Sequence, residues 1–139
     1  MKHIRHILRF LSAHIISAIV AATCALVLVI CFDDGLPKDD FIYLLKMWAV
    51  IAVVITLFVM PFSVIFYGLP EWRRMNMPIW VYALLGAGFA FAIVTLLSAD
   101  KNEGLLSPEV LRLYGYFIPS GLLAGLTFGT IRRRSMDRE

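Results

Sequence analysis

The chain has 139 residues, of which 60% are hydrophobic and only 17% are charged, with a net charge of +3. Soluble domains are usually about 45–50% apolar and about 25% charged, so this composition excludes an ordinary water-soluble fold. Once the apolar segments are counted, the length leaves no room for a separate soluble domain, a nucleotide-binding fold or a disulfide-stapled scaffold.

Apolar segments with few or no charges cover residues 10–32, 47–69, 75–99 and 113–131. Each has about the length, roughly 20 residues, that an α-helix needs to cross ~30 Å of hydrocarbon. Backbone groups in hydrocarbon must pair internally, and the alternating segments of about 10 residues that build a barrel are missing from the sequence, so helices are expected. With the start signals below, the predicted spans cover about residues 10–32, 41–69, 77–99 and 108–131.

Residues that cap helices precede three of these spans. Ser107 is a candidate N-cap, and Pro108 behind it suits the first turn of the fourth helix. Asp39 or Asp40 can cap the second helix in the same manner, and Asn76 can cap the third. These signals place the beginnings of the second, third and fourth helices.

The connections between the spans are short, which permits only antiparallel neighbours. The predicted fold class is therefore an all-α integral membrane protein, a single transmembrane domain over residues 1–139 with an up-down-up-down bundle. Aromatic residues near the proposed span ends are typical of interfacial belts. They are Trp48, Tyr67, Trp72, Trp80 and Tyr82.

The basic residues divide unequally between the two sides of such a bundle. Nine of the 13 lie at the chain ends and in the central loop: Lys2, Arg5, Arg9, Arg73, Arg74, Arg132, Arg133, Arg134 and Arg138. Because basic residues near span ends are retained in the cytoplasm, both termini and the central loop are predicted to be cytoplasmic. The positive charge thus reflects topology, and it does not indicate nucleic-acid binding, which requires a basic stripe interleaved with aromatic residues. Small size and minimal loops favour a bacterial inner membrane.

The N-terminal segment also has features of a secretory signal peptide, since basic residues precede an apolar run. However, the run continues unbroken to Phe32, and the small residues Ala21 to Cys24 make a poor cleavage site. We therefore expect a retained first helix.

The fourth span contains three glycines at a spacing of four, Gly121, Gly125 and Gly129. Residues four apart lie on one face of a helix, so these glycines form a groove about two turns long. Such small-xxx-small faces let membrane helices approach closely, where van der Waals contact replaces the missing hydrophobic drive.

Further rows of small residues occur on other spans. The first span offers a counterpart for the glycine face in Ala13, Ser17, Ala21 and Ala25, and the third span has two shorter rows, Gly86 with Ala90 and Gly88 with Ala92. Two alternatives follow. These faces pack the helices of one monomer, or one of them faces outward and binds a second copy or another membrane protein.

Pro61 and Pro119 each remove a backbone hydrogen bond and should kink their helices. A kink can serve as a hinge, but proline is also common in static spans. Ser63 and Ser120 are expected to satisfy the freed polar groups locally, which favours the static alternative.

His14 is the candidate buried polar residue of the first span, and it shares a helical face with Ser17 and Ala18. It is therefore expected to point toward protein. The alternatives are a hydrogen-bonded histidine, a proton relay or a haem ligand. A bis-histidine haem needs a second histidine inside the membrane, whereas His3 and His6 precede the span, so no cofactor is assigned.

Charged clusters flank the spans on both sides. The cytoplasmic bases would attract anionic lipid head groups by about 1 kcal/mol each; they include Arg73, Arg74, Arg132, Arg133 and Arg134. The outer acids could gather around a divalent cation but lack a calcium-loop pattern, so no metal site is assigned; they are Asp33, Asp34, Asp39 and Asp40.

The sequence contains no catalytic triad, metal-spaced cluster, P-loop or dinucleotide fingerprint, so we do not expect an enzyme. No Asp or Glu is expected to be buried within a span, since Glu109 lies at the very start of the fourth one, and this argues against carboxylate-coupled transport. The favoured hypothesis is a non-catalytic accessory or interaction subunit that docks by helix association in the lipid bilayer, with itself or with another membrane protein. The alternative is a homo-oligomeric channel with a basic cytoplasmic mouth, which is less favoured because no span has a polar stripe.

Overall fold

The computed structural model describes residues 2–32, 40–72, 77–99 and 107–136. These residues form the helices α1 (Lys2–Phe32), α2 (Phe41–Trp72), α3 (Ile79–Ala99) and α4 (Pro108–Met136). All regular secondary structure in this part of the chain is α-helical, which confirms the all-α class.

Three segments of these helices are long and apolar enough to cross a membrane, namely Ile7–Phe32, Phe41–Pro61 and Ile79–Ala99. The chain is thus built as a membrane protein. Helix α4 does not reach the same hydropathy, because glycine, serine and threonine interrupt its apolar residues and arginine lies near both of its ends. The fourth span stays a prediction.

The caps predicted for α2 and α4 are confirmed. Oδ1 of Asp40 accepts a hydrogen bond from the backbone N–H of Tyr43 at 3.0 Å, so Asp40 is the cap of α2. Oγ of Ser107 accepts a hydrogen bond from the backbone N–H of Val110 at 3.3 Å. The candidate caps Asp39 and Asn76 lie outside the described residues.

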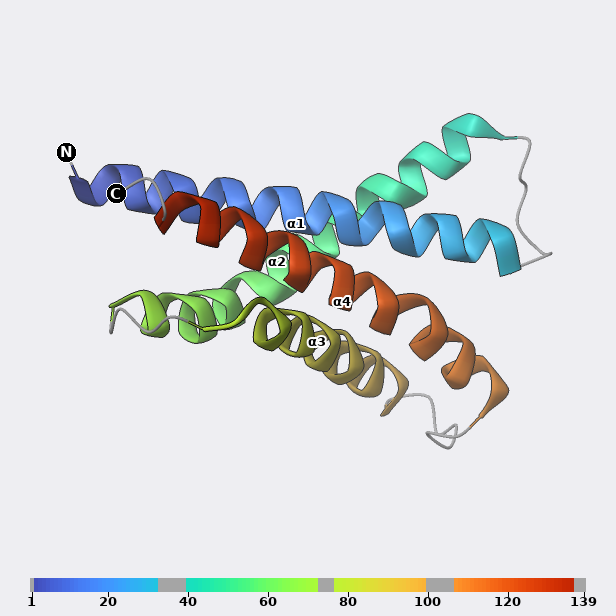
Figure 1. Cartoon of the computed structure of the whole chain (residues 1–139). Helices are drawn as coiled ribbons and strands as arrows, with labels where there is room; N and C mark the ends of the chain where they lie inside the picture. Colours follow the sequence, from blue (N-terminus) through green and yellow to red (C-terminus); the bar gives the residue numbers. More distant parts are fainter. Residues whose placement is uncertain (1, 33–39, 73–76, 100–106, 137–139) are drawn as a thin grey trace.

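Successive helices run in opposite directions (Figure 1). The α3–α4 interface is the most extensive, followed by α1–α4, and α2 joins the others chiefly through α1. Figure 1 shows α1 and α4 side by side, with α3 along the other side of α4 and α2 crossing away from the group. The least apolar helix, α4, therefore has the most protein around it.

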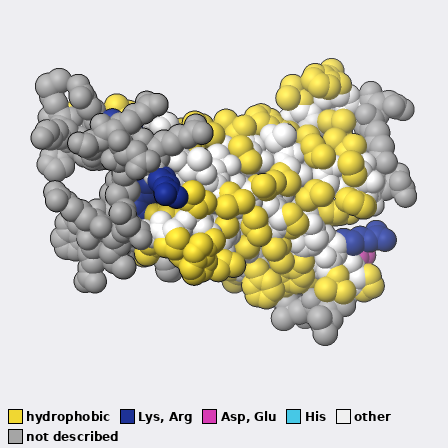
Figure 2. All heavy atoms as spheres, in the orientation of Figure 1, with side chains coloured by type: hydrophobic (Ala, Val, Ile, Leu, Met, Phe, Trp, Pro, Cys, Tyr) yellow, Lys and Arg dark blue, Asp and Glu magenta, His cyan; other side chains and the backbone are white. Residues whose placement is uncertain are grey.

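The surface of the described residues is dominated by hydrophobic side chains. Figure 2 shows them across the middle of one face, with basic side chains only toward its two ends. Helix α2 is the extreme case, because no residue of Phe41–Pro61 is buried. Such a helix requires an apolar solvent or an apolar partner.

Candidate functional site

The glycine face of α4 packs against the backbone of α3. A Cβ atom built on Gly86 would collide with the carbonyl oxygen of Gly121, and one built on Gly121 would collide with the carbonyl oxygen of Gly86. A Cβ on Gly125 would collide with the carbonyl oxygen of Tyr82, and a Cβ on Gly129 would lie 2.9 Å from the ring of the same tyrosine. The three glycines thus pack two helices of one monomer.

The expectation that the small-residue row of α1 is the counterpart of these glycines is wrong. Ala13, Ser17, Ala21 and Ala25 are all buried, but the backbone that fills the glycine groove belongs to α3. Ala13 instead joins a cluster with Tyr82 and Phe128. The spacing of small residues defines a face of a helix, but it carries no information about which neighbour that face meets.

The second row of small residues on α3 faces outward. Gly88 is exposed, and a Cβ atom built on it would have no neighbour within 4 Å among the described residues. Ala92, one turn further along, is also exposed. Two residues correspond to about 200° around a helix, which explains why Gly86 touches α4 while Gly88 faces away from it.

Both prolines lie within continuous helix. Helix α2 continues through Pro61 and α4 through Pro119, and the predicted kinks stay predictions.

Ser63 and Ser120 do not bind the carbonyl groups that the prolines free, so this prediction is wrong. Ser63 donates to the carbonyl of Val59 at 2.9 Å and Ser120 to the carbonyl of Tyr116 at 2.6 Å.

The carbonyls that the prolines leave free are those of Leu57 and Gly115, four residues before each proline. Both serines instead bind the carbonyl four residues before themselves, as hydroxyls in helices commonly do. The hydroxyl proton of each serine is therefore already used in a hydrogen bond within its own helix.

One of the predicted cytoplasmic bases is buried. Arg132 is 8% exposed, and its guanidinium carbon lies 5.4 Å from the centre of the Tyr82 ring, a cation–π contact. Tyr82 itself is 2% exposed, so its placement in an interfacial belt is wrong. Its ring is a core element between α3 and α4, because Gly129 leaves space beside it.

The other bases of the cytoplasmic set are described less fully. Arg133 is exposed at the end of α4. Arg73 and Arg74 lie outside the described residues, and the structure does not describe the side chain of Arg134. Of the outer acids, only Asp40 is described, and it serves as the cap of α2.

His14 points toward protein, as predicted. It is 4% exposed, and its Nε2 atom lies 3.3 Å from the carbonyl oxygen of Thr56 on α2. The ring of Phe10 stacks beside it at 6.4 Å between centres. Further along α1, Oγ1 of Thr23 accepts a hydrogen bond from Nε1 of Trp48 on α2 at 3.1 Å. These two hydrogen bonds fasten α2 to α1.

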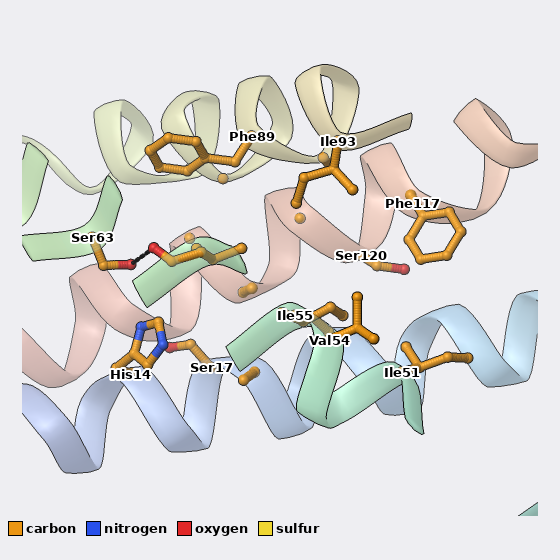
Figure 3. Close-up of a pocket in the computed structure, with 18 of the residues that line it drawn as sticks. His14, Ser17, Ile51, Val54, Ile55, Ser63, Phe89, Ile93, Phe117 and Ser120 are labelled. Atoms are coloured by element: carbon orange, nitrogen blue, oxygen red, sulfur yellow. Dashed lines mark hydrogen bonds between the residues drawn. The ribbon is translucent and has the colours of Figure 1, made fainter. Parts of the chain in front are cut away.

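A cavity of about 180 Å³ lies between α2 and the other three helices. All four helices contribute to its walls, which are overwhelmingly apolar (Figure 3). Its polar side chains are His14, Ser17, Ser63 and Ser120. We did not predict this cavity from the sequence.

Within the described residues, no group of three or more His, Cys, Asp or Glu side chains is placed to hold a metal ion. The polar groups of the cavity offer hydrogen bonds but no nucleophile paired with a base. Comparison with known proteins finds no matching protein family, curated protein or solved structure. The arrangement of the helices therefore carries the functional argument alone.

Proposed function

We propose that the chain is a four-span membrane protein with both ends in the cytoplasm, in which α4 is the fourth span. Glu109 and Arg112 stand near one end of α4 and Arg132 and Arg133 near the other. The 24 residue-to-residue steps from Glu109 to Arg133 correspond to a rise of about 36 Å, enough to cross the hydrocarbon layer. The close fit of α4 on α3 supports insertion of a helix that is not strongly apolar by itself.

We further propose that the protein acts without catalysis, by associating with another membrane protein as an accessory subunit. The outward row of α3 carries this proposal. Gly88 and Ala92 are exposed, and Leu84 and Leu96 continue the same row at 60% and 72% exposure. Small residues one turn apart, flanked by leucines, form the type of face on which a second membrane helix packs closely.

The glycines of α4 are excluded as the docking face because α3 already fills their groove. This leaves the row of Leu84, Gly88, Ala92 and Leu96, which we call the outer α3 seam. A bacterial inner membrane remains the proposed location, because the chain is small and the predicted loops between its spans are minimal.

The test is purification from native membranes in mild detergent, followed by identification of proteins that accompany the chain in fixed ratio. Gly88→Leu should abolish this association, since the side chain would block close approach at the seam. Gly115→Leu is the matched control, because Gly115 is also exposed with no neighbour within 4 Å, but on α4. Retention of the same partner by both variants would contradict the proposal.

Self-association is a separate outcome of the same experiment. Fluorescence energy transfer between two labelled copies in lipid nanodiscs should be low if the partner is a different protein. A transfer signal that disappears in Gly88→Leu would contradict the accessory role and assign the outer α3 seam to a second copy.

A further inference from the structure

The cavity opens toward the surroundings through apolar residues. Val50, Val54 and Leu97 line it, yet they are 62%, 37% and 60% exposed, so they form its mouth. The mouth lies beside α2, which joins the other helices chiefly through α1. In a bilayer these residues meet lipid tails, so any occupant enters from the membrane rather than from water.

The serines of the cavity have no donor left to offer. Ser17 donates to the carbonyl of Ala13 at 2.7 Å, and Ser63 and Ser120 bind carbonyls of their own helices in the same way. A hydroxyl group that already donates its one proton in a hydrogen bond still has lone pairs that can accept hydrogen bonds. These side chains therefore present acceptors to the cavity.

His14 also presents an acceptor. The carbonyl oxygen of Thr56 can only accept, so the ring proton of His14 lies on Nε2, which faces that oxygen at 3.3 Å. In the neutral imidazole, Nδ1 then carries a lone pair. Figure 3 shows the ring beside Ser17 on α1. Its Nδ1 atom has no hydrogen-bond partner among the described residues.

The size of the cavity limits what fits. An apolar cavity of about 150 Å³ in a protein holds benzene, so a cavity of about 180 Å³ accepts one six-membered ring with a small substituent. A longer tail would have to leave through the apolar mouth at Val54 and Leu97. Apolar walls with acceptor groups favour a ring that brings its own hydrogen-bond donor.

We propose that this cavity binds the hydroxyl-bearing ring of a membrane-dissolved phenol, with the hydroxyl donating to Nδ1 of His14. The ring lies against the apolar walls, and its alkyl tail extends toward lipid. This inference does not depend on the proposed association, because Gly88 is not among the cavity residues.

The probe is 4-propylphenol, and its comparison ligand is the methyl ether 4-propylanisole, which has nearly the same shape but no donor. Binding to the full chain in lipid nanodiscs is measured by ligand-observed NMR titration, with empty nanodiscs as the blank. The phenol should bind about tenfold more tightly than the ether, the ratio expected for one buried hydrogen bond. Equal affinities would overturn the proposal.

His14→Leu should reduce this preference to less than about twofold while ring binding persists. Val54→Trp tests the position independently, because a tryptophan at the mouth should weaken binding of both ligands at least tenfold. Val53→Trp is its matched control, since Val53 is 56% exposed on the same helix but does not line the cavity. Equal binding by the two tryptophan variants would overturn the proposal.

Gly88→Leu separates the two functions. It should bind 4-propylphenol as the unmodified chain does, even though it loses the protein partner. A loss of phenol binding in this variant would contradict the assignment of the ligand to the central cavity.

Discussion

The backbone of Gly121 on α4 occupies the space in which Gly86 on α3 would carry a side chain, and Gly86 does the same to Gly121. Two helices that meet in this way are held by direct backbone contact, which maximises dispersion over a short interface. Helix α4 also gains the stacking of Tyr114 on Phe91, at 5.1 Å between ring centres. The hydroxyl of Tyr114 lies 2.9 Å from Oγ1 of Thr95 and adds a hydrogen bond to the same interface.

Gly86→Ala should destabilise the protein by about 1–3 kcal/mol, because the added methyl group meets rigid backbone and forces α3 and α4 apart. Gly88→Ala adds the same methyl group two residues away, where no neighbour lies within 4 Å. Its effect should stay within about 0.5 kcal/mol. Unfolding in mixed micelles with increasing SDS, followed by circular dichroism, gives both values. Equal losses for the two variants would mean that α3 does not present Gly86 to α4.

The hydrogen bond between Trp48 and Thr23 should couple α2 to α1. Trp48→Phe and Thr23→Val each remove one partner, and the double variant removes both. Hydrogen bonds between membrane helices average about 0.6 kcal/mol in such double-mutant cycles, so a coupling of that order is expected. The same unfolding assay measures it. Strict additivity of the two single losses would show that the side chains do not interact.

The purified protein should not conduct ions in liposomes. The walls of the cavity are apolar, and a channel that conducts by a water-filled path needs polar groups or charges along it. Planar-bilayer recordings with potassium, chloride and protons as carriers provide the measurement. Unitary currents of reproducible size from the chain alone would support the channel alternative and contradict the accessory role.

Features that depend on nearby residues were predictable from the sequence. Asp40 and Ser107 cap their helices because a cap needs only a side-chain oxygen and a backbone N–H three residues later. The burial of His14 followed from the small residues on its own face. In each case the contacts that decide the outcome lie within one helix or within a few residues of its end.

Features that depend on which helices are neighbours were not predictable. The spacing of Gly121, Gly125 and Gly129 indicated a close approach, but α3 rather than α1 provides the partner backbone. Tyrosine is a residue type that is common at membrane interfaces, yet Tyr82 is a core residue because Gly129 leaves space for its ring. The cavity arises from the position of α2 relative to the other helices, and local sequence patterns do not predict that position.

The most direct test of the account concerns α4 as a membrane span. Single cysteines are introduced as Glu109→Cys or Arg133→Cys in a chain whose own cysteines, Cys24 and Cys31, are replaced by serine. Intact cells are then treated with a membrane-impermeant maleimide, before and after permeabilisation. The account predicts that the Glu109→Cys chain reacts in intact cells and the Arg133→Cys chain reacts only after permeabilisation. Reaction of both positions from the same side would contradict it.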